Sequence, residues 1–341
     1  MNAAGKITSV VPGLVVPGGE ITIECEGFQP SPGGDHGAYV GSVPCQLTAV
    51  SPRRILGAVD KISFPGETDV FLKSGNDEGE PVPIVVGRRI ADGMHIVANP
   101  AIDPSDDAII VTRSGSRGER MPQTIFRIEQ DGYIEELPDA IMNPTGIAFG
   151  PDGRMFVTNR ADGEVYMVSP NGINPVYASG LGIATGIAFD NEGVMFVGDR
   201  TGTIYRIPDI GIVEEFATLE PSVAAYHLAF GPDGRLYVSA PSLSSHDFIY
   251  SIGKKGKVER FAVGFGRPQG LAFDTDGNLY AAACYGGRHG IFRIEPDSLG
   301  ISQFVAGPNI VGLCFTAKGD LIAATNDSVY HLAANTFGTL L

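Results

Sequence analysis

The feature that most constrains this chain is a short segment that returns at nearly regular intervals. Its clearest copy, TGIAFGPDGRMFVT, begins at Thr145, and further copies begin at Thr185, Tyr226, Gln269 and Val311. The fifth position of these copies is always phenylalanine, with spacings of 40, 41, 43 and 42 residues between Phe149, Phe189, Phe230, Phe273 and Phe315. A repeat of this length is one supersecondary unit, which must stack on its neighbours to bury a core.

Each copy predicts two short strands joined by a tight turn, and a second apolar pair of strands follows it. Ala148 and Phe149 point to opposite faces of the first strand, which places one small and one large side chain between neighbouring units. The turn GPDG or DTDG supplies the Gly and Asp that hairpins require. A degraded copy begins at Asn99, so six units are present. Six four-stranded units predict a six-bladed β-propeller over residues 91–341.

The first ninety residues have a different pattern. Short alternating strands between Gly and Pro turns run from Ile7 to Phe28 and from Ala38 to Val59, which is typical of a small immunoglobulin-like sandwich. We place the boundary near residues 88–94, so the predicted domains are 1–90 and 91–341. The predicted fold class is therefore all-β, a six-bladed propeller preceded by a β-sandwich. The 46 glycines and 24 prolines among 341 residues fit this turn-rich reading.

The net charge limits the classes of molecule that this protein is expected to bind. With 24 basic and 39 acidic residues the net charge is −15, so we expect neither nucleic acid nor a membrane surface as partner, because both need a basic face. The first ten residues lack an apolar core of signal-peptide length, which favours a cytoplasmic protein. The four cysteines lack CxxC spacing, which favours free or buried thiols over a zinc site. Whether Cys25 and Cys45 are bridged stays open.

Propeller geometry predicts where a site would lie. Two groups of loops lie on the same face of a propeller: the loops that lead into the innermost strands, and the loops that join the second strand of each blade to the third. In the second group, the loops predicted at 112–124, 239–248 and 282–290 are the longest. Extra length there indicates either function or a tolerated insertion, and the sequence leaves both open.

Basic residues gather in these loops. Seven arginines map to this mouth, namely Arg113, Arg117, Arg120, Arg160, Arg200, Arg267 and Arg288. Clustered arginines suit bidentate capture of a carboxylate or phosphate. Alternatively, some of them pair with Asp162, Asp199, Glu119 or Asp327 and brace the loops. We predict a partly cationic mouth for a small anionic molecule, with candidate binding residues His95, Asn99, Arg113, Arg160, Arg200, Arg267, Gln269, Arg288 and His289.

One histidine stands where the other copies have glycine. The inner-strand entrances carry Gly146, Gly186, Gly270 and Gly312, but the fourth copy carries His227. A side chain there should project toward the mouth or wedge between blades. His227 is thus either a general acid or base near neutral pH or a packed histidine bonded to a carbonyl. His95, which enters the first blade, has the same two interpretations.

The repeat copies look like NHL-type repeats, and residues 95–335 resemble the six-bladed gluconolactonase (senescence-marker-protein) family. The order S-x-x-P, P-G-G-x-I-T-I, G-F and V-G in the first domain resembles an IPT/TIG domain, which implies a spacer or a protein-docking surface. The gluconolactonase resemblance implies lactone hydrolysis and a divalent, calcium-like cation held by acidic and amide side chains at the strand entrances. Those positions here are Asn99, Thr145, Thr185, Tyr226, Gln269 and Val311. None is a carboxylate, although hard cations favour several carboxylate or carbonyl oxygens, so the weak metal candidates are Asn99, Asn143 and Asn309.

Two functional hypotheses follow. In the first, the protein is a lactonase- or esterase-like hydrolase, or a lyase, that acts on a small anionic or lactone-type substrate at the mouth, with His227 as the catalytic acid or base. In the second, the protein is a non-catalytic propeller that binds a ligand or a protein at the same mouth. A catalytic site needs a titrating group beside the ligand, whereas a binding site needs only shape and donors.

Overall fold

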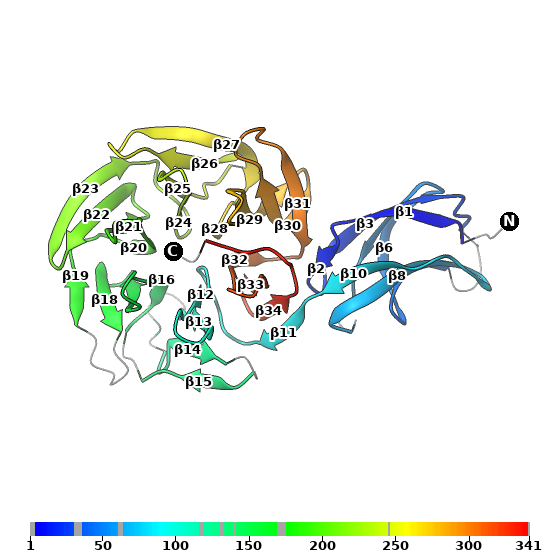
Figure 1. Ribbon diagram of the computed structural model, residues 1–341, viewed down its shortest axis with the longest axis horizontal. Coiled ribbons are helices and arrows are strands. Elements are labelled where there is room, and N and C mark those ends of the chain that lie inside the picture. Colours follow the sequence, from blue (N-terminus) through cyan, green and yellow to red (C-terminus); the bar gives the residue numbers. More distant parts are fainter. Residues whose placement is uncertain are drawn as a thin grey trace.

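The computed structural model describes residues 4–30, 36–60, 64–115, 119, 121–129, 132–138, 141–168, 175–244 and 246–339. Within these residues every regular element is a β-strand, which confirms the predicted all-β class. Figure 1 shows a ring of small sheets beside a separate N-terminal body. No described segment forms an apolar helix of membrane-spanning length.

The ring consists of six blades of four antiparallel strands. The strands of each blade are given from the axis outward. The first blade contains β12 (Ala101–Ile102), β13 (Ile109–Thr112), β14 (Ile125–Ile128) and β15 (Ile134–Glu136), and the second contains β16 (Pro144–Phe149), β17 (Met155–Asn159), β18 (Glu164–Val168) and β19 (Val176–Ala178). The third contains β20 (Ala184–Phe189), β21 (Met195–Asp199), β22 (Thr203–Asp209) and β23 (Ile212–Thr218). The next two are β24 (His227–Phe230), β25 (Leu236–Ser239), β26 (Asp247–Ile252) and β27 (Val258–Gly266); and β28 (Leu271–Phe273), β29 (Leu279–Tyr285), β30 (Arg288–Ile294) and β31 (Ile301–Ala306).

The sixth blade closes the ring with a strand from the other end of the propeller. Its inner strands are β32 (Ile310–Phe315), β33 (Leu321–Thr325) and β34 (Val329–Leu332). Its outermost strand is β11 (Arg88–Ala91), which pairs antiparallel with β34 so that Arg88 lies opposite His331. The segment that precedes the first blade therefore completes the last one.

The N-terminal domain consists of two sheets that enclose one core. The first sheet contains β1 (Lys6–Val11), β3 (Glu20–Glu26), β7 (Arg54–Ala58) and β6 (Gln46–Val50). The second contains β2 (Leu14–Val15), β10 (Val82–Val86), β8 (Gly66–Ser74), β4 (His36–Val40), β5 (Val43–Pro44) and β9 (Asp77–Glu78). Ile21 and Ile23 from one sheet are buried together with Val70 and Leu72 from the other. Cys25 and Cys45 are both free thiols in this core.

The N-terminal domain is joined to the fifth blade through backbone pairing. Strand β2 pairs in parallel with both β10 and β31, and Leu14 lies opposite Val305. The Val16 amide also donates to the carbonyl of Ala306 at 2.9 Å. One continuous sheet therefore runs from the N-terminal domain into the propeller, which holds the two parts together more firmly than side-chain contacts alone.

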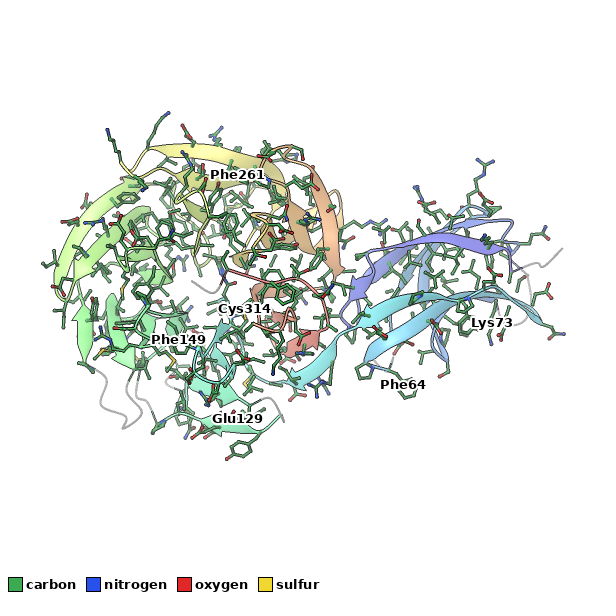
Figure 2. The ribbon with its side chains drawn as sticks, in the orientation of Figure 1. Phe64, Lys73, Glu129, Phe149, Phe261 and Cys314 are labelled. Carbon is green, nitrogen blue, oxygen red and sulfur yellow. The ribbon has the colours of Figure 1, made fainter. Side chains whose placement is uncertain are left out.

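Aromatic contacts between blades explain the phenylalanine at the fifth position of the repeat. This phenylalanine packs against an aromatic ring on the second strand of the preceding blade in four consecutive pairs: Phe156–Phe189, Phe196–Phe230, Tyr237–Phe273 and Tyr280–Phe315, with ring centroids 4.9–5.4 Å apart. A third aromatic ring, from the outermost strand of the preceding blade, packs edge-on against the ring of the second strand. Phe261 packs in this way on Tyr237, with the ring centroids 4.9 Å apart. Figure 2 shows Phe261 on an outer strand and Phe149 toward the inside of the ring.

Candidate functional site

The face on which the inner strands begin contains a cavity of about 270 Å³. Five of the residues singled out from the sequence lie in its wall, namely His95, Arg160, Arg200, Arg267 and Gln269. The wall also contains Thr145 and Thr185 at two strand entrances, Asn326 from the sixth blade and a set of apolar residues. None of the aspartates or glutamates that the structure describes contributes to it. We call this cavity the mouth pocket.

Arg160 and Arg200 reach the mouth pocket because each follows a turn at the end of a second strand. The Asn159 side-chain oxygen accepts from the Ala161 amide at 2.8 Å, and the Asp199 side chain accepts from the Thr201 amide at 2.9 Å. Asp199 also accepts from the Ile183 amide at 2.9 Å. Asp199 thus shapes the turn and, contrary to one interpretation of the sequence, forms no ion pair with an arginine.

Within the described part of the chain, the guanidinium groups of Arg160 and Arg200 donate to backbone carbonyls. Arg160 Nη2 donates to the carbonyl of Gly115 at 3.1 Å, while Arg200 donates to the carbonyls of Ser222 at 3.3 Å and Val223 at 3.2 Å. No carboxylate of the described residues pairs with Arg160, Arg200 or Arg267. Burial lowers the pKa of Arg160, and the positive charge of Arg200 lowers it further. Two like charges therefore face one cavity without a counterion.

The strand entrances share an unusual backbone conformation. His95, Asn143, Arg267 and Asn309 have φ values of 47°, 50°, 50° and 56°, in the left-handed region that non-glycine residues rarely adopt. Each precedes an inner strand on the mouth face by a few residues. This recurrent turn places His95 and Arg267 in the pocket wall, and both residues are exposed.

Several polar atoms on this face are buried without a partner. Among the described residues, five buried side-chain N or O atoms lack a hydrogen bond, and four belong to Arg113, Asn143, Thr145 and His227. In the next blade, by contrast, the hydroxyl of Thr185 donates to the carbonyl of Gly198 at 3.0 Å and accepts from the Tyr226 amide at 3.1 Å. Unsatisfied buried polar atoms are rare and need an explanation such as a bound molecule. Thr145 is the one that lies in the pocket wall.

His227 does not contribute to the pocket wall. Its side chain is 3% exposed, and burial lowers its pKa to about 4. At the equivalent positions a Cβ on Gly146 or Gly186 would collide with the backbone of the next blade, so a side chain here wedges between blades. The ring is packed, as one interpretation held, but its Nε2 has no hydrogen bond to a carbonyl. The histidine that lies beside the arginines is His95.

Asn99 connects two inner strands instead of facing the mouth. Its amide nitrogen donates to the carbonyl of Leu271 at 2.9 Å, and its oxygen accepts from the Leu313 amide at 3.1 Å. Asn143 is buried, whereas Asn309 is exposed. No group of three or more His, Cys, Asp or Glu side chains within the described residues is placed to hold a metal ion. Guanidinium groups repel a cation, so the residues of the mouth do not fit the divalent cation that the family resemblance implied.

The remaining predicted residues lie elsewhere. The sequence predicted a loop at 282–290, but β29 and β30 continue through it and meet at a turn containing Gly286 and Gly287. Arg288 is drawn outward, where its Nη1 pairs with Glu20 of the N-terminal domain at 2.5 Å. His289 is exposed on the same hairpin. Arg113 does not contribute to the wall of the mouth pocket, and Arg117 and Arg120 lie outside the described residues.

The opposite end of the ring contains a larger cavity of about 620 Å³. It is lined at the same position of five consecutive inner strands by Ala148, Ala188, Ala229, Ala272 and Cys314, and Figure 2 shows Cys314 near the middle of the ring. Burial raises the pKa of the Cys314 thiol, so this thiol remains neutral. The C-terminal segment reaches this end, where the Thr339 amide donates to the carbonyl of Phe273 at 3.0 Å. Most of its lining residues are apolar, and its polar members, among them Asn99, Ser105 and Asp107, include no positively charged side chain of the described residues.

Thr145, Thr185 and Val311 were placed at the strand entrances but not among the candidate binding residues, and the apolar segment Val223–Ala225 was not predicted to line the pocket. The segment Val223–Ala225 reads as core in the sequence because it is apolar and precedes an inner strand. Its position in the repeat could have predicted its place in the pocket, because a segment that leads into an inner strand lies at the mouth whatever its polarity.

Comparisons with known proteins support the fold. No protein-family profile matches the sequence, and no match was found among curated proteins. A gluconolactonase from Xanthomonas campestris is similar in structure, with a TM-score of 0.60 and 16% identity over 77% of this chain and 89% of its own. Virginiamycin B lyase from Staphylococcus aureus has a TM-score of 0.54 and 18% identity over 72% of this chain and 97% of its own. An auxiliary nutrient binding protein from Bacteroides ovatus has a TM-score of 0.54 and 12% identity, and it matches 98% of both chains.

At these identities the likeness concerns the fold alone. The gluconolactonase and the lyase match about three quarters of the chain, whereas the nutrient binding protein matches nearly all of it. The chain thus contains a six-bladed β-propeller, as the sequence predicted. What it binds has to be argued from its own residues.

Proposed function

We propose that this protein binds a small organic anion in the mouth pocket. One observation carries the proposal: Arg160, Arg200 and Arg267 converge on a single cavity to whose wall the described residues contribute no carboxylate. Charge-assisted hydrogen bonds from guanidinium to carboxylate or phosphate are about twice as strong as neutral ones. An anion between Arg160 and Arg200 would also relieve their mutual repulsion. The volume of about 270 Å³ lies just below the range of about 300–1,000 Å³ common for small-molecule pockets.

The overall charge of the protein sharpens this proposal. At −15 the molecule as a whole repels anions, so long-range attraction does not deliver the ligand. Hydrogen-bond donors in the pocket itself must therefore bind the ligand. Thr145 supplies a buried hydroxyl without a partner in the same wall, which a hydrogen-bonding group of the ligand would satisfy.

The test measures binding of acetate, butyrate and inorganic phosphate by calorimetry. Removing a charged partner from a buried pair costs about 2–5 kcal/mol, and for the half-buried Arg200 we expect the lower end. Arg200→Gln should then weaken binding by roughly thirtyfold, and Arg160→Gln should act in the same direction. Arg206→Gln is the matched control, because Arg206 lies in the same blade but pairs with Glu214 at 2.8 Å outside the pocket. Equal affinities in the Arg200 and Arg206 variants would refute anion binding at the mouth.

Catalysis at the same pocket is the second candidate function. His95 supports it, because an exposed imidazole lies in the wall beside the arginines, and histidine is the usual proton-transfer group near neutral pH. The similar structures include a gluconolactonase and a lyase, which favours hydrolysis of a lactone or ester, or an elimination. The nutrient binding protein is consistent with binding without turnover.

A panel of lactones and esters distinguishes these functions. If a chemical step occurs, His95→Ala should abolish most of the turnover, whereas His227→Ala should change it only through stability. Because His95 lies in the wall and His227 does not, the two variants form a matched pair. Absence of turnover with every compound, together with tight carboxylate binding, would leave binding as the function.

For the N-terminal domain we infer a docking or spacer role, which the resemblance to IPT/TIG domains suggested. The continuous sheet through β2 and β31 supports it, because a domain fixed in this way presents its outer surface at a constant angle to the propeller. Deleting residues 1–86 would also remove the β2 partner of β31. Surface substitutions on the first sheet therefore test docking better than truncation does.

A further inference from the structure

We propose that the ligand is an amphipathic anion, with a carboxylate head held by the arginines and a hydrocarbon body of a few carbon atoms against an apolar wall. This inference rests on the proposed function and concerns the class of ligand. A purely hydrophilic anion, such as inorganic phosphate, would use only half of the pocket.

The apolar half of the pocket is contributed by three blades. Ile96 and Val97 come from the entrance to the first blade, Val223–Ala225 from the entrance to the fourth, and Val311 from the sixth. The side chain of Val223 is 41% exposed, so it is not part of the packed core. An apolar surface left open inside a pocket is typical of a site that binds an apolar group.

The charged and apolar parts of the pocket are joined by direct contacts. Arg200 Nη2 donates to the carbonyl of Val223 at 3.2 Å, and Arg200 Nε donates to the carbonyl of the preceding Ser222 at 3.3 Å. These bonds fix the guanidinium beside Val223, and its Nη1 has no partner among the described residues. A carboxylate bound there places its adjoining carbon atoms next to Val223. Head and body are therefore recognised by neighbouring groups of one site.

The apolar wall is hydrogen-bonded to a neighbouring loop, which carries an exposed leucine. Pro241 accepts hydrogen bonds from the Ser222 hydroxyl at 2.8 Å and from the Val223 amide at 2.9 Å. The same loop, which connects β25 to β26, carries Leu243, whose residue surface is 93% exposed. The loop with this exposed leucine is thus tied to the apolar wall. A hydrocarbon body that extends out of the pocket would meet this loop.

Chain length provides the test. Linear monocarboxylates from acetate to octanoate are titrated into the full-length protein at fixed ionic strength. Burial of each methylene should raise the affinity about fourfold until the chain outgrows the pocket. Straight-chain alkylammonium ions of the same lengths should not bind, because the arginines repel them. Affinities that rise with chain length for carboxylates alone would support the proposal.

Two variants test which residues cause the increase of affinity with chain length. Val223→Ser should reduce the gain in affinity per methylene, whereas Ile212→Ser, which alters an exposed isoleucine on the outermost strand of the third blade, should leave that gain and acetate binding unchanged. Carboxylates that bind with equal affinity at all lengths would overturn the amphipathic ligand but leave anion binding intact. Binding of alkylammonium ions as tight as that of carboxylates would overturn the role of the arginines. No binding of any carboxylate would overturn the proposed function itself.

Discussion

Arg288 and Glu20 lie 268 positions apart in the chain, and Arg288 Nη1 approaches the Glu20 carboxylate to 2.5 Å. The pair connects the hairpin of the fifth blade to the N-terminal domain. Arg288 therefore belongs to the domain contact and not to the mouth pocket, although it was one of the arginines predicted from the sequence to line the mouth. Both side chains are partly buried, and the neighbouring β2–β31 pairing supports the same contact.

The first prediction concerns this ion pair. We expect Arg288→Gln and Glu20→Gln each to lower the free energy of unfolding by about 1 kcal/mol, because partly exposed pairs contribute little. The double variant should cost less than the two single variants together. Carboxylate affinity should be unchanged in all three, since neither residue lies in the pocket wall. Chemical denaturation and calorimetry check this, and a loss of affinity in Arg288→Gln alone would contradict it.

The sequence predicted the propeller well because the repeat encodes a physical contact. The phenylalanine anchors are spaced by one blade, and in the structure four of the five pack on a ring of the preceding blade. The closing strand β11 could not be found in this way. An outermost strand contacts its blade mainly through backbone hydrogen bonds, so RRIA needs no residue of the repeat motif and reads as a linker.

The site was harder to predict because a sequence pattern gives the end of a strand but not the direction of a side chain. His227 and His95 both stand at strand entrances, yet one is buried between blades and the other lies in the pocket wall. Arg288 was assigned to a loop, although Gly286–Gly287 is a common signal for a two-residue hairpin. That signal could have predicted that the strands continue.

The second prediction tests the contact between blades. Phe273 is 4% exposed, and its ring centroid lies 4.9 Å from that of Tyr237 in the preceding blade. Phe273→Ala removes this contact and leaves a cavity, so we expect a loss of about 3–5 kcal/mol in the free energy of unfolding. Phe64→Ala is the control, because Phe64 is 65% exposed. Similar urea midpoints for the two variants would mean that the repeat phenylalanine does not stabilise the ring.

The third prediction concerns pH. The pKa of His227 falls from its ordinary value of 6.5 to about 4 because the ring is buried. The unfolded chain therefore binds a proton in the window between pH 6.5 and 4 that the folded chain does not. Stability from this group is complete above pH 6.5 and decreases as the pH falls, by roughly 3 kcal/mol in total.

Urea denaturation from pH 7.5 to 4.5 measures this effect by difference. Carboxylates also titrate in part of that window, so the comparison is with His227→Gln, which lacks the ionising ring. The wild type should lose stability more steeply than His227→Gln below pH 6.5. Parallel curves for the wild type and His227→Gln would show that the histidine is not buried in its neutral form.

The fourth prediction compares two threonines at equivalent positions of neighbouring blades. The hydroxyl of Thr145 is buried without a partner, whereas the hydroxyl of Thr185 has two. Thr185→Val should therefore cost about 1–3 kcal/mol of stability, because it leaves the Tyr226 amide unsatisfied. Thr145→Val should cost nothing, or even stabilise the free protein, while it weakens binding of a ligand that hydrogen-bonds to this hydroxyl. Thermal denaturation with and without a carboxylate separates the two effects. If Thr145→Val destabilises the free protein as much as Thr185→Val does, the hydroxyl of Thr145 has a structural role and is not available to bind a ligand.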